Sequence, residues 1–187
     1  SVRLYDLEGR ETRRFEVAKP GPVAIGADGG IFVVENILWP NDEGWKLAPG
    51  NAPRVVRLSP EGKRLGVCNA PKSGWLPSAL SVDRKNPNRL LIADASRNQL
   101  VYKIDTPKMQ VAGTFGVPGG YLAGPVPGRV GPGRLMRPWG VGTDASGNLY
   151  VLNAKPHTAV HRPVIQKYDK RGKLVWDIKS LAWVDSV

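Results

Sequence analysis

The sequence predicts an all-β fold built from a repeated four-stranded unit. Three observations support this prediction. Apolar and polar residues alternate in short runs, turn sequences rich in Asp and Gly separate those runs, and the whole pattern returns along the 187 residues. The 22 Gly and 17 Pro are spread along the chain, which favours many short strands joined by turns over a disordered segment.

The most regular unit consists of two successive hairpins. In the first, an apolar alternation ends at Asp144, turns through residues 145–148 and resumes at residues 149–151. In the second, residues 169–173 form the turn between two further alternating runs. A Gly-containing tight turn between two alternating runs is typical of a β-hairpin, so the unit has four strands.

Other stretches match this unit in whole or in part. Residues 1–17 match its second hairpin, residues 23–67 match a whole unit with an insert, and residues 78–115 match another whole unit. We therefore expect a single domain of repeated units. Its divisions are a half unit at 1–18, whole units at 19–75, 76–133 and 134–180, and the beginning of a further strand at 181–187.

Self-similar units of four short strands are typical of a β-propeller, in which each unit is one blade of a ring. The run Gly-Val-x-x-Asp-x-x-Gly-Asn-Leu-Tyr-Val at 140–151 is followed by Ile-Gln-Lys-Tyr-Asp-x-x-Gly-Lys at 165–173. These two runs resemble NHL repeats. The chain departs from that pattern in its long inserts and at Thr106-Pro107, which replaces a turn glycine. The resemblance implies a propeller of NHL type.

About three and a half blades do not close the six-bladed ring that the resemblance implies. An open ring leaves unpaired strand edges, which soluble proteins avoid. We therefore expect the chain to belong to a larger ring, as a fragment of a longer polypeptide or as a subunit completed by other chains. A closed four-bladed ring that joins the two ends in one blade is an alternative, but it lacks one strand.

Strand direction predicts where the inserts lie. Because successive strands are antiparallel, the links after the first and third strands of a blade lie on one side of the ring, and the other links lie on the opposite side. The short Asp- and Gly-containing turns belong to the first group. The sizeable inserts belong to the second group and are residues 37–52, 69–77, 117–137 and 154–163. We expect this long-loop face to carry the binding residues.

Composition restricts the function only in part. The net charge of +11 suits an acidic glycan, another polyanion or nucleic acid, although a basic solvated surface is the simpler explanation. The single cysteine, Cys68, forms no internal disulfide, so cysteine usage does not indicate a compartment. No apolar run approaches the ~20 residues of a membrane span, and no signal peptide is recognised. The NHL resemblance favours an extracytoplasmic location.

The predicted binding residues lie in or beside the inserts. Trp39 and Trp45 could stack on sugars or anchor a protein partner, whereas Trp139 and Trp176 occupy repeat-equivalent positions that packing between blades explains. The Gly- and Pro-rich insert 117–137 contributes a basic surface. The complete predicted set is Trp39, Trp45, Tyr121, Arg129, Arg134 and Arg137.

We predict no catalytic residue, no metal ligand and no cofactor. Enzymes of this architecture place polar groups, usually carboxylates that hold a metal, around the central channel. The residues that lead into the first strands are Pro22, Pro77-Ser78 and Pro138-Trp139, which include neither a carboxylate nor a histidine. His157 and His161 have a spacing that suits a metal on a helix, but they lie in a predicted loop without a third ligand.

Recurring polar residues have simpler structural roles. Asp28, Asp83 and Asp144 lie at the tight turns, where we expect them to accept hydrogen bonds from backbone N–H groups. A further set ends the second strand of each blade, on the long-loop side, and we expect it to form hydrogen bonds there. This set is Asn36, Asp94 and Asn153.

The sequence therefore favours a non-catalytic, NHL-like interaction module that binds protein or glycan through its long-loop face. Two alternatives stay open. The resemblance also allows a metal-dependent lyase or lactonase whose ligands come from blades outside this chain. An RNA-binding propeller would require basic residues clustered with aromatic ones, whereas the basic residues here are distributed over both sides of the predicted ring.

Overall fold

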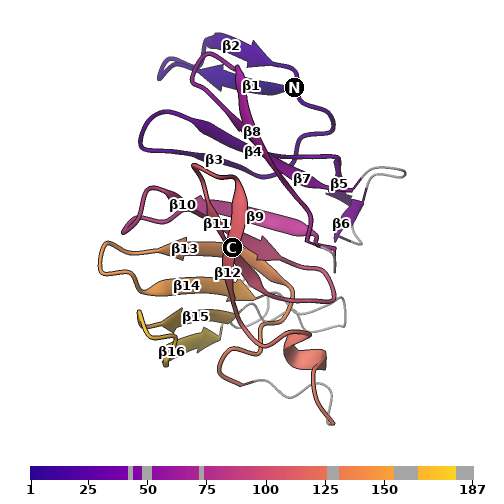
Figure 1. The fold of residues 1–187 in the computed structure, drawn as a ribbon, viewed down its shortest axis with the longest axis vertical. Coiled ribbons are helices and arrows are strands. Elements are labelled where there is room, and N and C mark those ends of the chain that lie inside the picture. Colours follow the sequence, from indigo (N-terminus) through magenta and orange to yellow (C-terminus); the bar gives the residue numbers. More distant parts are fainter. Residues whose placement is uncertain (42–43, 48–51, 72–73, 126–130, 154–163, 180–187) are drawn as a thin grey trace, which may run out of the picture.

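A computed structural model shows an all-β chain, and the described residues are 1–41, 44–47, 52–71, 74–125, 131–153 and 164–179 (Figure 1). Its strands follow one another along the chain with only one short 3-10 helix, η1 (Gly120–Leu122), among the described residues. The strands are β1 (Val2–Tyr5), β2 (Glu11–Phe15), β3 (Val23–Ile25), β4 (Ile31–Glu35), β5 (Ile37–Asn41), β6 (Gly44–Leu47), β7 (Arg54–Leu58), β8 (Arg64–Asn69), β9 (Pro77–Val82), β10 (Arg89–Asp94), β11 (Val101–Asp105), β12 (Gln110–Phe115), β13 (Pro138–Thr143), β14 (Leu149–Asn153), β15 (Val164–Tyr168) and β16 (Leu174–Lys179).

These strands form successive antiparallel sheets. Sheet I has the order β3-β4-β7-β8, sheet II the order β9-β10-β11-β12 and sheet III the order β13-β14-β15-β16. Strands β1 and β2 form a separate N-terminal hairpin ahead of sheet I. Strand β9 lies against both β3 and β13, so the first strands of the three sheets are neighbours. This is the architecture of a partial β-propeller, as the repeats predicted.

The sheets stack face to face in chain order, with the N-terminal hairpin on sheet I (Figure 1). Side chains alternate between two cores because successive residues of a strand point to opposite faces. In β4, Ile31 and Val33 pack toward the N-terminal hairpin, while Phe32 and Val34 pack toward sheet II. A strand that is buried on both faces needs a continuous apolar run, which explains why Ile31–Val34 carries no polar residue.

The turn aspartates act as caps, which confirms the sequence prediction. The Oδ1 atoms of Asp28, Asp83 and Asp144 accept hydrogen bonds from the N–H groups of Gly30, Lys85 and Asn148, each at 2.9 Å. An Asp side chain in this position replaces the backbone partner that a tight turn removes. Asp28 and Asp83 accept from the residue two positions ahead and Asp144 from the residue four positions ahead, and in each case the hydrogen bond secures the turn.

The long connections lie on the side opposite the short turns (Figure 1). One of them contains structure that the sequence did not predict, because β5 and β6 pair as a hairpin within the expected insert 37–52. The insert 154–163 and the expected strand at 181–187 lie outside the described residues. The predicted placement of the inserts on one face is therefore confirmed for the links from β4 to β7, β8 to β9 and β12 to β13.

Candidate anion-binding site

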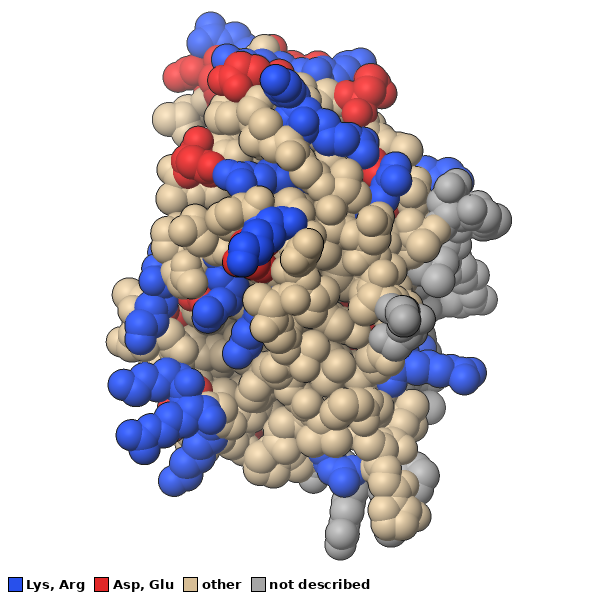
Figure 2. Space-filling model, in the orientation of Figure 1, with Lys and Arg blue, Asp and Glu red and all other residues tan. Residues whose placement is uncertain are grey.

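A pocket of ≈ 550 Å³ opens between sheets II and III on the short-turn side of the molecule. The turn from β9 to β10 and the turn from β15 to β16 form its rim, and strands β10, β11 and β12 supply further side chains. Five of its residues are basic: Lys85, Arg89, Lys103, Lys170 and Arg171. Lys and Arg side chains gather along this edge of the molecule (Figure 2). The pocket is thus a cationic site between two sheets.

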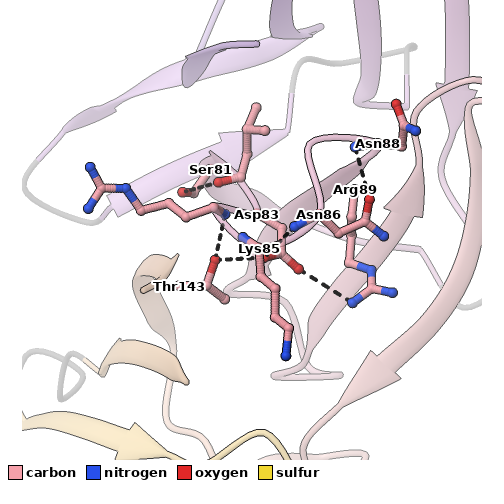
Figure 3. Close-up of polar contacts among 9 residues, drawn as sticks. Ser81, Asp83, Lys85, Asn86, Asn88, Arg89 and Thr143 are labelled. Atoms are coloured by element: carbon pink, nitrogen blue, oxygen red, sulfur yellow. Dashed lines mark hydrogen bonds and ion pairs between the residues drawn. The ribbon is translucent and has the colours of Figure 1, made fainter. Parts of the chain in front are cut away.

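Asp83 organises one wall of the pocket (Figure 3). Besides capping its own turn, its Oδ1 atom accepts a hydrogen bond from the Thr143 hydroxyl at 2.9 Å, and Thr143 Oγ1 in turn accepts one from the Arg84 N–H at 2.9 Å. Thr143 belongs to β13 of sheet III, so this network ties the turn of sheet II to the next sheet. The Asp83 carboxylate also pairs with Arg89 Nη1 at 3.4 Å, and its side chain is only 6% exposed.

The remaining cations of the pocket have no carboxylate partner. Within the described part of the chain, no carboxylate oxygen lies within 4.0 Å of the charged nitrogens of Lys85, Lys103, Lys170 or Arg171. Asp169 lines the same pocket, but its Oδ1 atom accepts hydrogen bonds from the N–H groups of Arg171 and Lys173 at 2.9 and 2.8 Å. The pocket therefore presents uncompensated positive charge, which favours an anionic ligand.

The pKa of the Asp169 carboxyl is lowered, as expected beside the positive charge of this pocket. The backbone N–H of Lys173 lowers the pKa of this carboxyl most strongly, and the N–H of Arg171 and the charges of Arg171 and Lys173 lower it further. Asp169 thus stays ionised and occupied with its own turn. It caps the turn that carries Lys170 and Arg171 and so holds these two basic residues at the rim of the pocket.

The pocket contains a position that a paired cation occupies in sheet I. In sheet I, Arg57 on the third strand pairs with Asp28 of its own blade at 2.8 Å, and its Nη1 donates to the carbonyl of Thr106 in sheet II at 3.4 Å. Lys103 occupies the corresponding place in sheet II, because it pairs in register with Leu91 as Arg57 does with Phe32. Asp83 is held by Arg89 and Thr143 instead, and Lys103 lines the pocket.

Gly147, in the turn between β13 and β14, forms another part of the pocket rim. Its φ of +83° lies in the left-handed region, and a Cβ atom at this position would come within 2.7 Å of Lys85 Cδ. A residue with a side chain would strain the backbone here, and its Cβ atom would displace the Lys85 side chain. The absence of a side chain thus lets Lys85 lie across the β13–β14 turn, against the pocket.

The floor of the pocket is apolar. Leu91 and Leu149 are buried between the sheets, and Phe115 packs edge-on against Tyr168 at a centroid distance of 4.6 Å. Cations at the rim of a low-dielectric floor attract an anion more strongly than the same cations on an open surface. The arrangement can bind a negatively charged group.

The structure describes the side chains of three of the six predicted binding residues, Tyr121, Arg134 and Arg137. Arg134 Nη1 donates to the carbonyl of Ala123 within its own loop, so its guanidinium serves the loop. The backbone N–H of Arg137 donates to Gln99 Oε1 at 3.0 Å, and the N–H of Tyr121 donates to the carbonyl of Leu135 at 3.0 Å. Arg129 lies outside the described residues, as do the side chains of Trp39 and Trp45, whose backbones belong to β5 and β6. The long-loop binding surface thus stays a prediction.

Two of the predicted strand-end residues anchor the incoming chain. Asp94 Oδ1 accepts the N–H of Leu76 at 2.7 Å, and Asn153 Oδ1 accepts the N–H of Met136 at 2.8 Å, just before the first strand of the same sheet in each case. Both side chains are buried, and burial raises the pKa of Asp94. The prediction of hydrogen bonds at the blade ends is confirmed for these two residues.

Asn36 forms only a weaker contact of 3.4 Å, from its side-chain Nδ2 to the carbonyl of Ala52. In sheet I the buried strand-end residue is its neighbour Glu35, which is 1% exposed and pairs with Arg54 and Arg64. The one-residue difference arises because β4 ends at Glu35, whereas Asn36 has a φ of 64° and has left the strand.

The described residues contain no group of three His, Cys, Asp or Glu side chains that could hold a metal ion. His157 and His161 lie outside them. Cys68 is buried, and burial raises its pKa to about 11, so it is a poor nucleophile. Among the described helices, none could cross a membrane.

The sequence contained a signal for the cationic pocket that was not used. Lys85, Lys170 and Arg171 belong to short turns, which the strand directions place on one side of the ring, but other basic residues of the sequence fall on the opposite side. The structure brings the turn of sheet II next to the turn of sheet III and adds Arg89 and Lys103 from strands. Packing between neighbouring blades, and not spacing in the sequence, creates the site.

Comparisons with known protein families and with curated proteins found no match. Among solved structures, a protein of unknown function from Bacteroides caccae matches 95% of this chain and 74% of its own chain, with 15% identity and a TM-score of 0.45. A quinonprotein alcohol dehydrogenase-like protein from Bacteroides thetaiotaomicron matches 85% of this chain and 33% of its own, with 13% identity and a TM-score of 0.47. The fold assignment therefore rests on the strand order and packing of this chain itself.

Proposed function

We propose that this chain is a non-catalytic, NHL-like propeller module that binds an anionic partner, an acidic segment of a protein or an acidic glycan, through the cationic pocket between sheets II and III. The observation that carries the proposal is the group of Lys85, Lys103, Lys170 and Arg171 around one pocket, with no carboxylate partner for any of them among the described residues. Unpaired cations that converge on a concave site favour recognition of negative charge.

Binding fits this pocket better than catalysis does. Its two carboxylates are both engaged, since Asp83 is held by Thr143 and Arg89, and Asp169 caps its own turn. The Thr143 hydroxyl lies beside Asp83, but its hydrogen bond with the Arg84 N–H and the pairing of Asp83 with Arg89 hold both groups in the turn network. Positive charge held by capped turns on a rigid scaffold is suited to recognition.

The test compares two double variants with the same change in net charge. Lys170→Gln with Arg171→Gln removes two cations from the pocket, whereas Lys63→Gln with Lys108→Gln removes two exposed cations from other turns on the same side of the molecule. The probes are a sulfated oligosaccharide and a poly-glutamate peptide, and affinity is measured by calorimetry at low and moderate salt. The pocket variant should lose about tenfold in affinity, or ~1.4 kcal/mol, and the control should lose less than about twofold.

The outcomes separate specific binding from general attraction. Equal losses in the two double variants would contradict the pocket and indicate attraction by net charge alone. Binding should weaken as salt screens the charges, and a preference between the two probes identifies the class of partner.

The long-loop face with Trp39 and Trp45 stays a second binding proposal. Trp39→Ala with Trp45→Ala should weaken partner binding without loss of folding if that face contributes. The alternative of an RNA-binding propeller is tested in the same assay with a single-stranded RNA, whose affinity would have to exceed that of both other probes. A lyase or lactonase would require a stoichiometric bound Ca²⁺ or Zn²⁺ in metal analysis of the purified protein.

A further inference from the structure

The outer face of sheet III carries large apolar side chains that no other described strand covers. Ile165, Trp176 and Ile178 are 41%, 36% and 55% exposed, whereas the apolar residues on the opposite face of the same sheet are buried against sheet II. Sheet III lies at the far end of the stack from the N-terminal hairpin (Figure 1). Three large apolar side chains on one face of a sheet indicate an interaction surface.

These side chains form ordered rows across the strands. One row runs from Leu152 to Ile165 to Ile178, as the pairing registers of β14 with β15 and of β15 with β16 show. The next row runs from Tyr150 to Lys167 to Trp176. Tyr150 and Trp176 pack edge-on at a centroid distance of 6.0 Å.

Sheet I contains the same first row, and there it is covered. The equivalent row runs from Val34 to Val55 to Cys68, in the same register on strands β4, β7 and β8. These side chains are 0%, 0% and 2% exposed because sheet II packs on them. The same position in the repeat is therefore buried in sheet I and exposed in sheet III.

The second row repeats a pairing of a cation with an aromatic ring. In sheet I the Arg57 guanidinium lies 5.8 Å from the centroid of the Phe32 ring, and in sheet III the Lys167 ammonium lies 5.3 Å from the centroid of the Tyr150 ring. Each cation also faces the turn aspartate of its own blade, with Arg57 at 2.8 Å from Asp28.

In sheet III the Lys167 ammonium lies 4.0 Å from Asp144. In sheet I the arrangement has one more component, because Arg57 donates to the Thr106 carbonyl in a turn of the covering sheet at 3.4 Å. Lys167 is the matching donor for such a carbonyl in whatever covers sheet III.

We propose that the outer face of sheet III binds a further four-stranded antiparallel sheet, separate from the sheets described here, that packs on it as sheet II packs on sheet I. The facing strands of that partner present aliphatic side chains, as Leu90 and Ile92 of sheet II do. In the partner sheet, the turn between the third and fourth strands directs a backbone carbonyl toward Lys167. The cationic pocket lies on the other face of sheet III, so the two proposed binding sites can be tested separately.

A second copy of this chain is a poor occupant of that face. The free face of the N-terminal hairpin bears Arg3 and Arg14, both of which pair with Glu11 in ion pairs of 3.5 and 3.0 Å. Burial of these charged groups under an aliphatic face would cost more than their pairing returns. Two sheet III faces placed against each other would bring Lys167 of each copy to the same interface.

The experiment joins a second copy of residues 76–115, the segment that forms sheet II, after Val187 of the full chain. In this tandem protein, mass spectrometry measures the reaction of Lys167 with an amine-directed reagent and the hydrogen exchange of β16. The tandem protein should show about tenfold slower exchange in β16 and a matching loss of Lys167 reactivity. The control carries Leu90→Lys and Ile92→Lys in the added copy only, and it should behave like the unfused chain.

Each outcome decides the proposal. If the added copy is protected from exchange in its own strands while Lys167 stays fully reactive, the proposal is overturned. If the added copy does not fold, the proposal also fails, because the same residues fold against the equivalent face of sheet I. Sedimentation of the unfused chain should give the mass of a monomer, and a dimer that Trp176→Lys abolishes would show that a second copy occupies the face instead.

Discussion

Asp28, Asp83 and Asp144 all cap short turns, but Asp83 and Asp144 directly follow the first strand of their sheets, whereas Asp28 lies three residues after the end of β3. Asp28 and Asp144 each pair with a cation on the third strand of their own sheet, Arg57 and Lys167. Asp83 is instead engaged by Arg89 and by Thr143 of the next sheet. Lys103, the residue of sheet II that corresponds to Arg57 and Lys167, forms no ion pair with a carboxylate among the described residues and lines the cationic pocket.

Asp144 gives the chain a pH-dependent contribution to stability. Hydrogen bonds from the side chain and backbone of Asn148, with smaller effects of Tyr150 and Lys167, lower its pKa to about 2 from 3.8. Because the folded-state pKa is the lower one, this contribution is complete above pH 3.8 and is lost as the pH falls toward 2. Asp144→Asn should therefore lower the melting temperature at neutral pH and have little effect near pH 2, as measured by circular dichroism. An equal decrease at both pH values would show that the charge of Asp144 is not responsible.

Tyr168 connects the long loop before β13 to sheet III. Its hydroxyl accepts the N–H of Gly133 at 3.2 Å and donates to Gln166 Oε1 at 2.9 Å, and the side chain is 0% exposed. Tyr168→Phe leaves the half-buried N–H of Gly133 without its partner, so it should cost ~1–3 kcal/mol in urea unfolding. Tyr150→Phe is the control, because the Tyr150 side chain is only half-buried; a loss as large as that of Tyr168→Phe would contradict the role of burial.

At the scale of elements, the turn between β7 and β8 contributes to the packing of the neighbouring hairpin. The turn between β7 and β8 approaches the N-terminal hairpin so closely that a Cβ atom on Gly62 would lie 2.1 Å from Phe15 Cδ1. Gly62 also has a φ of +87°, in the left-handed region. This glycine is thus required by both the turn and the contact between blades.

Gly62→Ala and Gly9→Ala separate these two requirements. Gly9 has a similar φ of +81°, but a Cβ atom there would have no neighbour within 4 Å. Both substitutions should cost ~1 kcal/mol for the backbone conformation, and Gly62→Ala should cost ~1–3 kcal/mol more because Phe15 must move. Urea unfolding of the two variants measures the difference, and equal costs would show that the contact with Phe15 relaxes freely.

At the scale of the whole molecule, stability resides in the cores between the sheets. Ile92 lies between sheets I and II and is 0% exposed, whereas Ile178 on the outer face of sheet III is 55% exposed. Ile92→Ala should cost ~2–5 kcal/mol and Ile178→Ala less than ~0.5 kcal/mol in urea unfolding of the full chain. A large loss for Ile178→Ala would mean that its face is already covered in solution.

The local parts of this fold could be predicted from the sequence for a physical reason. Alternation of side chains and turn chemistry act over a few residues, so the strands and the Asp and Gly turns could be recognised directly. Strand direction then placed the long connections on one side. The hairpin β5–β6 was missed because it lies inside an insert that has no counterpart in the other repeats.

The sequence by itself determined the all-β repeat, the turn caps and the side on which the long connections lie, because these features depend on neighbours along the chain. Only the tertiary structure decided where positive charge is concentrated. Lys85, Lys103 and Arg171 come from different elements and two sheets, and they meet because the sheets stack face to face. The same stacking leaves the outer face of sheet III exposed, although its row of apolar residues repeats one that is buried in sheet I.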